Sequence, residues 1–181
     1  MTRSRVTRSK VLSSRDPAVA TVRGAVRSFL DAAAGWLTSG QVYLAVSGGA
    51  DSLALAAVAV PLAHRRGASV HGLVVDHGLQ GGSADVAGRA AEQLLELGAD
   101  TARVLTVAVS GGGGLEAAAR RARYSALRSA LPGPDTLVLL GHTRDDQAET
   151  VLLGLGRGSG PRSIAGMRAV DPPWGRPLLG V

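Results

Sequence analysis

The sequence predicts an α/β fold in which a doubly wound, mostly parallel sheet carries helices on both faces. Apolar runs of strand length alternate with longer stretches of helical periodicity, as is typical of βαβ units. The short runs are apolar almost throughout, which indicates strands buried on both faces. In such sheets ligands bind beyond the carboxyl ends of the strands, so a site is expected in the loops that follow them.

Four strands and four helices are expected from these patterns. In the second helix the apolar residues recur at helical spacing, and Ser83 is placed to cap its start. The last residues, 176–181, form an apolar, strand-like stretch. The expected strands are 42–46, 70–76, 103–109 and 136–140, and the expected helices are 51–66, 83–97, 115–131 and 145–153.

The segment Ser47-Gly48-Gly49-Ala50-Asp51-Ser52 joins the first strand to the first helix. The first N–H groups of a helix lack partners and the helix dipole adds positive charge, so this turn is suited to phosphate. Its glycines let the backbone approach an anion, and Ser47 and Ser52 can donate hydroxyl hydrogen bonds. Asp51 would repel phosphate unless a divalent cation such as Mg²⁺ lies between them. The loop therefore predicts a nucleotide-phosphate site with Asp51 as a metal ligand.

Two other phosphate-binding loops are excluded by the spacing. No lysine follows the glycines, as the Gly-x-x-x-x-Gly-Lys-Ser/Thr loop requires, and Gly48-Gly49 lacks the Gly-x-Gly-x-x-Gly pattern of dinucleotide-binding folds. An ordinary strand-to-helix turn stays an alternative in a chain with 25 glycines.

Composition restricts the class of protein. A length of 181 residues suits one domain; we expect a basic flexible tail at 1–16 and the domain at 17–181. The net charge of +6 favours an anionic partner such as nucleic acid, although 3% aromatic residues are too few for base stacking. The absence of cysteine excludes disulfides and thiolate metal sites. The longest apolar stretch, 53–63, is shorter than the ~20 residues of a membrane span, so we expect a cytoplasmic protein.

Distinctive residues follow each expected strand. Asp76 and His77 follow the second strand and Gly141 and His142 the fourth, while a tetraglycine, 111–114, follows the third. Because the carboxyl ends of parallel strands meet at one edge, these segments are expected to lie beside residues 47–52. Asp76 would hold a ribose hydroxyl there or cap its own turn. The Gly- and Arg-rich segment 154–162 is not expected to be regular; it either wraps an anion or is a loose connection.

Two helices carry charged groups suited to chemistry. Asp146 and Glu149 share one face near a helix start, where a carboxylate pair can bind an amine, hold a metal ion or accept a proton; Asp145 is the expected helix cap. On the third helix, Arg120 and Arg123 either face phosphate or form a solvent-facing stripe.

These motifs, in this order, closely resemble the tRNA(Ile)-lysidine synthetase family. Its N-terminal catalytic domain is a PP-loop ATP pyrophosphatase domain, Rossmann-like and similar to the adenine nucleotide alpha hydrolases. The resemblance covers about residues 40–181, and the specific motif is His-Thr-x-Asp-Asp-Gln-x-Glu-Thr at 142–150, since many adenylating enzymes share the first loop. The matching segments are 46–52, 75–79, 115–124, 141–150, 157–160, 165–167 and 176–179.

The resemblance implies a ligase that forms a carbon–nitrogen bond during tRNA modification. Members use ATP and Mg²⁺ to adenylate the C2 oxygen of the wobble cytidine in an isoleucine tRNA with a CAU anticodon. The amine of free lysine then displaces AMP and leaves lysidine. The implied partners are tRNA(Ile), L-lysine and ATP, with no membrane; a homodimer is left open.

The resemblance also implies roles for residues of this chain. Residues 47–52 would bind the pyrophosphate end of ATP, and Asp51 would hold Mg²⁺. Asp146, with Glu149, would receive the lysine ammonium and help to deprotonate it, while Arg120 and Arg123 would contact phosphates or steady the developing charge. The implied ATP-binding set is Ser47, Gly48, Gly49, Ala50, Asp51, Ser52, Asp76, His77, Gly141 and His142, and the implied catalytic set is Asp51, Asp146, Arg120 and Arg123.

Two departures and two alternatives accompany this interpretation. Gln80 stands where the family usually has arginine, so one basic contact is missing. Family members continue beyond the point that matches residue 181, so we expect the domain to be truncated at its C-terminal end. The alternatives are another PP-loop adenylating enzyme, such as a tRNA thiolase, against which the absence of cysteine argues, or a nucleotide- or RNA-binding fragment without catalysis.

Overall fold

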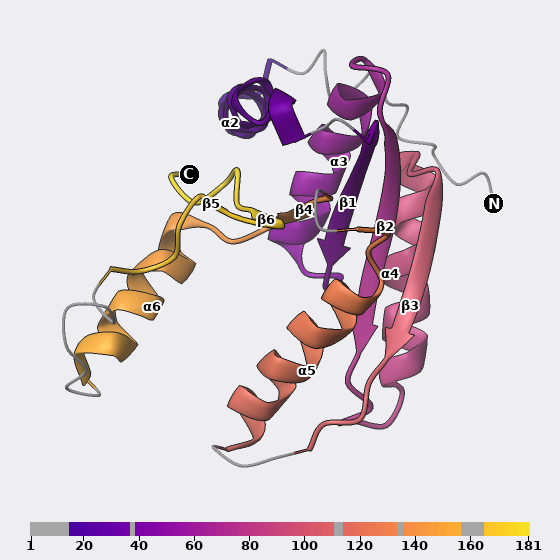
Figure 1. Cartoon of the computed structure of the whole chain (residues 1–181), viewed down its shortest axis with the longest axis vertical. Helices are drawn as coiled ribbons and strands as arrows, with labels where there is room; N and C mark the ends of the chain where they lie inside the picture. Colours follow the sequence, from indigo (N-terminus) through magenta and orange to yellow (C-terminus); the bar gives the residue numbers. More distant parts are fainter. Residues whose placement is uncertain (1–14, 37–38, 111–113, 134–135, 157–164) are drawn as a thin grey trace.

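The computed structural model describes residues 15–36, 39–110, 114–133, 136–156 and 165–181. Most of the tail expected at 1–16 therefore lies outside the described residues, as do Gly111–Gly113 of the tetraglycine and residues 157–162. The elements (Figure 1) are, in order, α2 (Pro17–Ala32), the short 3₁₀ helix η1 (Ala34–Trp36), β1 (Gln41–Val46), α3 (Ala50–His64), β2 (Ser69–Asp76), α4 (Ser83–Leu97), β3 (Thr101–Thr106), α5 (Leu115–Ser129), β4 (Leu137–Leu140), α6 (Arg144–Gly156), β5 (Val170–Asp171) and β6 (Trp174–Gly175).

The described strands form one sheet in the order β3-β2-β1-β4-β6-β5. All neighbours are parallel except β5, which runs antiparallel to β6. The chain builds outward from β1 through β2 to β3 and then returns to the other side of β1 with β4. This reversal creates a topological switch point between β1 and β4, where doubly wound sheets bind their ligands. The predicted fold class is confirmed.

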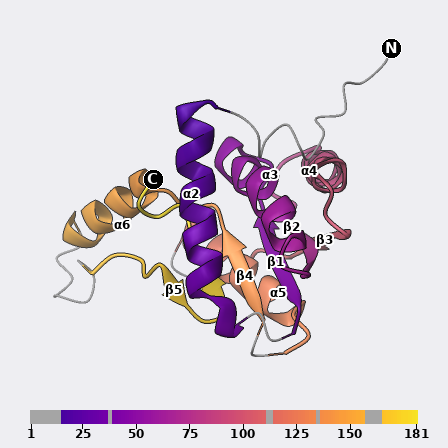
Figure 2. The same ribbon diagram turned by 90° about the horizontal axis from the view of Figure 1, so that it is seen from above.

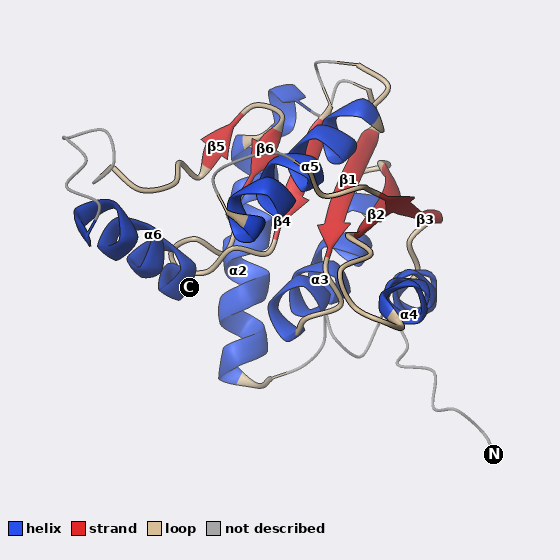
Figure 3. Cartoon of the chain, turned by 90° about the horizontal axis from the view of Figure 1, so that it is seen from below, coloured by secondary structure: helices blue, strands red, loops and turns tan. Residues whose placement is uncertain are grey.

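Helices cover both faces of this sheet. Helices α2, α3 and α4 lie on one face and α5 on the other, while α6 stands beside the β6–β5 edge (Figures 2 and 3). The strands alternate accordingly: Val42, Leu44 and Val46 of β1 point into the core under α3, whereas Ala45 joins the core under α5. Of the described helices, α2, α3 and α4 therefore cover one face and α5 the other.

Most expected elements are present, with shifts at their ends. Helix α4 has the expected bounds, whereas β3 begins two residues earlier than expected and ends at Thr106. Helix α2 was not expected, although its start is well marked. The Asp16 carboxylate accepts hydrogen bonds from the N–H groups of Ala18 and Val19 at 2.8 and 3.5 Å, and Pro17 occupies the first helical position.

Three local expectations are wrong. Ser83 does not cap α4, because Gly82 occupies the cap position with φ 81° and Ser83 is already helical. Residues 176–181 form no strand: they turn, with hydrogen bonds from Leu179 N to Arg176 O and from Val181 N to Leu178 O, at 3.3 and 2.9 Å. Residues 154–156 of the supposedly irregular segment continue α6. Among the described residues, no helix is both long and apolar enough to cross a membrane.

Candidate nucleotide site at the sheet switch point

The loops that follow β1 and β4 touch each other at the switch point. A Cβ atom on Gly141 would lie 2.9 Å from Ser52 Cα and 3.0 Å from Ser52 N. These distances are shorter than a side chain tolerates, so only glycine allows the backbone after β4 to lie against the first turn of α3. The contact brings residues 47–52 and the segment that begins at Gly141 into one site.

The loop after β1 is held together by its own hydroxyl groups. Ser52 Oγ donates to Gly49 O at 2.8 Å and lies 3.3 Å from Ser47 Oγ, while Gly49 N donates to Ser47 Oγ at 3.4 Å. Gly48 has φ 83°, which favours glycine. No side chain caps the start of α3, and Asp51 is exposed in its first turn. The loop therefore has the helix-start geometry that suits an anion.

Arg120 and Arg123 of α5 lie close enough to His142 for their positive charges to act on it. The Arg120 guanidinium lies over the Tyr124 ring, 5.2 Å from its centre. Arg123 is half-buried, and burial lowers the pKa of its guanidinium. Desolvation is costly for a cation, so an anionic ligand beside Arg123 would offset this cost.

His142 is the most strongly perturbed of these groups. Burial, together with the positive charges of Arg123 and Arg176, lowers its pKa from 6.5 to about 4, against the opposing effect of Asp146. The imidazole is therefore neutral near pH 7. Its Nδ1 atom is buried and has no hydrogen-bond partner among the described residues. A neutral ring in a positive environment, with one nitrogen unpaired, is suited to contact a substrate.

Asp146, rather than Asp145, closes the first turn of α6. Asp146 Oδ2 accepts hydrogen bonds from Thr143 N at 2.7 Å and from Thr143 Oγ1 at 3.1 Å. The expectation that Asp145 is the cap is therefore wrong; Asp145 is exposed, as is Glu149. Only one oxygen of Asp146 is used in this way, so the other oxygen can meet a cation.

Asp76 lies at the end of β2, at the same edge of the sheet, and its side chain stabilises the local turn. Asp76 is 6% exposed, and its Oδ1 accepts a hydrogen bond from Gly78 N at 3.0 Å. Hydrogen bonds from Gly78 and from the Ser83 hydroxyl lower the pKa of this carboxyl. Asp76 thus fixes the turn before α4. The neighbouring His77 has a buried Nδ1 without a partner among the described residues; contact of either residue with a nucleotide stays a prediction.

No role was predicted from the sequence for three residues of this region, although Gln147 and Arg176 stand in segments that carry the resemblance. Arg176 is 5% exposed, donates from Nη1 to Arg168 O at 2.8 Å, and has a buried Nε without a described partner. Gln147 ties α6 to the segment before β5: its Nε2 donates to Met167 O at 2.9 Å and its Oε1 accepts from Met167 N at 2.6 Å.

The third missed residue is Trp174, which lies against Tyr124 of α5. The signal for Arg176 was its place at the start of the apolar stretch 176–181. Without knowing that β6 pairs parallel with β4, that place could not be assigned to the carboxyl edge of the sheet.

Comparisons with known proteins show the family of the chain. The model of the PP-loop domain family matches residues 21–181. The chain is 58% identical to the tRNA(Ile)-lysidine synthase of Rhodococcus erythropolis over 171 residues, covering 94% of this chain and 50% of the relative. The corresponding values are 66% identity, 77% and 42% for Nocardia farcinica, and 57% identity, 92% and 49% for Mycobacterium tuberculosis. The chain thus spans about half the length of these curated relatives.

A solved structure supports the fold alone. The U34-tRNA thiolase NcsA from Methanococcus maripaludis, with its [4Fe-4S] cluster, superposes with a TM-score of 0.62 at 18% identity, covering 92% of this chain and 61% of that chain. The phosphate-suited loop after β1, its contact with the segment after β4 and the family match over residues 21–181 agree, and the chain belongs to the PP-loop domain family.

Proposed function

We propose that this chain forms the ATP-binding and adenylating part of a tRNA(Ile)-lysidine synthase. The observation that carries the proposal is the contact of Gly141 with Ser52. It joins the phosphate-suited loop to the segment His142–Glu149. A bound nucleotide and the carboxylates that would bind an amine, Asp146 and Glu149, would therefore lie in one site. The similarity to lysidine synthases over more than three quarters of this chain supports the same reaction.

ATP would lie across the switch point with its pyrophosphate end on residues 47–52. The N–H groups at the start of α3 and the Ser47 and Ser52 hydroxyls would donate to phosphate oxygens. Among the described residues no three His, Cys, Asp or Glu side chains gather into a metal site. Asp51 alone still fits Mg²⁺, which binds one or two carboxylates together with substrate phosphates and supplies charge neutralisation there. Contacts of Asp76, His77, Gly141 and His142 with the nucleotide belong to this proposal.

In the first step, the C2 oxygen of the wobble cytidine attacks the α-phosphorus of ATP and pyrophosphate leaves. Arg120 and Arg123 would stabilise the negative charge that builds on the phosphate oxygens. The neutral His142 would contact the same region through its unpaired nitrogen. The basic net charge of +6 suits binding of the tRNA substrate.

In the second step, the lysine amine attacks C2 and AMP leaves with the C2 oxygen. The amine must lose a proton to become a nucleophile. Asp146, through the oxygen that does not bond to Thr143, and the exposed Glu149 would receive the ammonium and take this proton. A carboxylate pair at the start of α6 is suited to both tasks.

Incorporation of labelled lysine into tRNA(Ile) tests the proposal. We expect incorporation only with ATP and Mg²⁺, its loss in Asp146→Asn, and its retention in Asp145→Asn, the matched control one residue away. Absence of ATP binding would contradict the proposal outright. ATP–pyrophosphate exchange without lysine incorporation would identify another PP-loop adenylating enzyme, and ATP binding without exchange would identify a binding fragment.

The location and the oligomeric state of the protein are separate parts of the proposal. A tRNA-modifying enzyme acts in the cytoplasm, where fractionation should place the protein. A homodimer is also proposed, and light scattering coupled to gel filtration tests it: a single-chain mass would contradict the dimer without touching the reaction.

A further inference from the structure

Helix α5 carries both proposed phosphate-binding arginines but buries few side chains of its own. Its buried residues are Ala118 and Leu127, and it alone covers its face of the described sheet (Figure 3). Ala118 is small, and Leu127 lies near the far end of the helix from Arg120. Another contact must therefore set how α5 is rotated about its axis, because rotation decides where Arg120 and Arg123 point.

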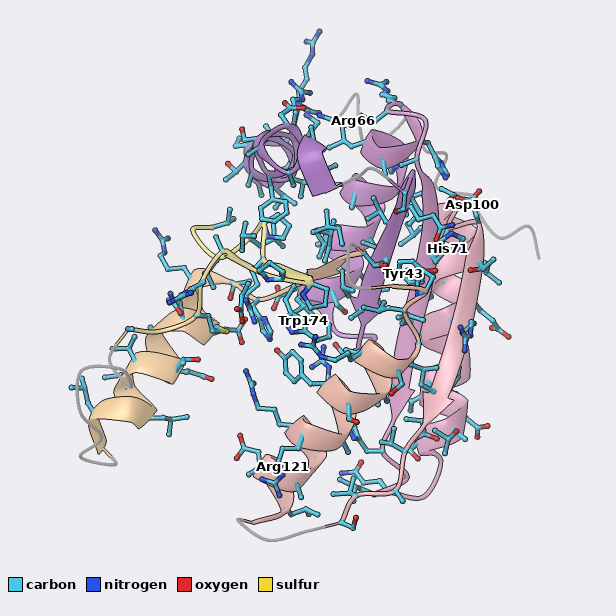
Figure 4. The ribbon with its side chains drawn as sticks, in the orientation of Figure 1. Tyr43, Arg66, His71, Asp100, Arg121 and Trp174 are labelled. Atoms are coloured by element: carbon cyan, nitrogen blue, oxygen red, sulfur yellow. The ribbon has the colours of Figure 1, made fainter. Side chains whose placement is uncertain are left out.

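Trp174 of β6 supplies that contact. Its ring meets the Tyr124 ring edge to face, with centres 5.0 Å apart and planes at 84°, and the Arg128 guanidinium lies 5.4 Å from its centre. Trp174 is only 5% exposed and points from the β5–β6 hairpin toward α5 (Figure 4). Arg120 in turn lies over Tyr124 at 5.2 Å. Arg120, Tyr124 and Arg128, one helical turn apart, are thus linked through Trp174 in a row of cation and ring contacts.

Strand β6 is itself held firmly from the opposite face. A Cβ atom on Gly175 would lie 2.6 Å from Phe29 Cζ and 3.1 Å from Leu139 Cδ2, so α2 and β4 press directly on the backbone next to Trp174. A strand confined in this way cannot adjust to α5. The helix must instead adopt the rotation that the edge-to-face geometry allows.

We propose that Trp174 is a positioning residue that fixes the rotation of α5 and thereby directs Arg120 and Arg123 to the nucleotide site. This inference rests on the proposed function for the role of the two arginines. Leucine at this position would fill much of the space but offer no aromatic ring to Tyr124 or to the Arg128 guanidinium. Phenylalanine would keep the ring.

The test compares Trp174→Leu and Trp174→Phe with Tyr43→Leu, a matched loss of an aromatic ring from β1, where the Tyr43 ring contacts His71. Amide hydrogen exchange of residues 115–129, with residues 83–97 of α4 as internal reference, reports the seating of α5. The equilibrium dissociation constant of ATP reports whether Arg120 and Arg123 reach the nucleotide. We expect Trp174→Leu to speed exchange in α5 and to weaken ATP binding about three- to tenfold. Trp174→Phe should restore both, and Tyr43→Leu should change neither selectively.

The possible failures are distinguishable. Unchanged α5 exchange and ATP affinity in Trp174→Leu overturn the positioning role, and so does an equal effect of Tyr43→Leu. If Trp174→Leu does not fold, Tyr124→Leu removes the same pair from the helix side and is judged by the same criteria. Arg120→Met and Arg123→Met test the proposed function separately: normal ATP affinity in both, with α5 exchange raised by Trp174→Leu, refutes the role of the arginines and keeps the positioning of the helix.

Discussion

Asp146 and Thr143 form a closed pair at the start of α6, in which one carboxylate oxygen accepts both the backbone N–H and the hydroxyl of the threonine, at 2.7 and 3.1 Å. The pair fixes the direction of the Asp146 side chain, so the second oxygen is presented in a constant position. A residue can thus stabilise a helix and serve a substrate with different atoms of one group.

These two roles are separable by substitution. Asp146→Asn keeps an acceptor for Thr143 and should unfold like the wild type, whereas Asp146→Ala loses the cap and about 1 kcal/mol of stability. Both should lose lysine incorporation, because neither carries the charge that attracts the ammonium. Urea denaturation and the incorporation assay measure the two effects. An Asn variant that incorporates lysine normally would refute the substrate role while leaving the cap intact.

The lowered pKa of His142 predicts that the free energy of unfolding decreases at acidic pH. Its pKa is lowered from 6.5 to about 4 in the folded chain, so below pH 6.5 the unfolded chain binds a proton that the folded chain does not. Stability should fall from pH 6.5 toward pH 4 for this reason. Denaturation midpoints across this range in wild type and His142→Gln measure it, and the variant should show a flatter profile. Identical profiles would contradict the buried, neutral ring.

An ion pair far from the site predicts a different pH dependence. Asp100 Oδ2 lies 2.8 Å from His64 Nε2 and accepts a hydrogen bond from Val70 N at 2.7 Å, and these bonds lower the pKa of its carboxyl below 3.8. Its contribution is present above pH 3.8 and is lost as the pH falls below that value. Asp100→Asn should lose about 1 kcal/mol near neutral pH.

The exposed Asp171 of β5 provides the control for this pair, and Asp171→Asn should unfold like the wild type. Denaturant unfolding at neutral pH and near pH 3 separates the effects. A wild-type-like Asp100→Asn at neutral pH would show that the pair contributes nothing.

Gly141→Ala should damage both the fold and the nucleotide site. The added Cβ would lie 2.9 Å from the Ser52 backbone, so the loop after β4 must move away from α3, at a cost of roughly 1–3 kcal/mol. Calorimetric binding of ATP should weaken in parallel. Gly88→Ala is the control, because nothing lies within 4 Å of its added Cβ. Full ATP affinity in Gly141→Ala would show that nucleotide binding does not depend on the contact between the loops after β1 and β4.

Gln147→Ala should release the segment that precedes β5. The side-chain amide of Gln147 bonds to both the N–H and the carbonyl of Met167, at 2.6 and 2.9 Å, so its loss leaves two backbone groups unpaired. Limited proteolysis should cut near residues 165–169 sooner than in the wild type. Gln147→Glu keeps the acceptor but not the donor, so its cleavage rate should lie between those of the wild type and Gln147→Ala. Unchanged cleavage in Gln147→Ala would show that other contacts hold the segment.

The sequence predicted the parts of the fold that depend on periodicity. The strands around Leu44 and Leu139 and the helix at Ser83–Leu97 follow from apolar runs and helical spacing, and parallel strands placed Asp51, Asp76 and His142 at one edge. Helix α2 was not predicted, because the basic, Ser-rich sequence before it resembles a tail. Asp16-Pro17 is nevertheless a typical helix start.

The contacts of the site were harder to predict, because they join distant segments. The pairing of Gln147 with Met167 spans twenty residues, and the meeting of Tyr124 with Trp174 depends on β6 lying beside β4. A one-dimensional pattern carries no signal for either. The choice between Asp145 and Asp146 as cap is also local geometry, since one residue of rotation decides which carboxylate faces Thr143.

The hydroxyl bonds within residues 47–52 also bear on how fast and how tightly a phosphate group can be captured. Ser52 Oγ to Gly49 O and Gly49 N to Ser47 Oγ hold the loop in shape by bonds of its own, so the loop is preorganised. An incoming polyphosphate would displace water without first ordering the backbone, and little conformational entropy would be lost on binding. Capture should then approach the rate of diffusional encounter, and affinity differences among nucleotides should appear in their dissociation rates.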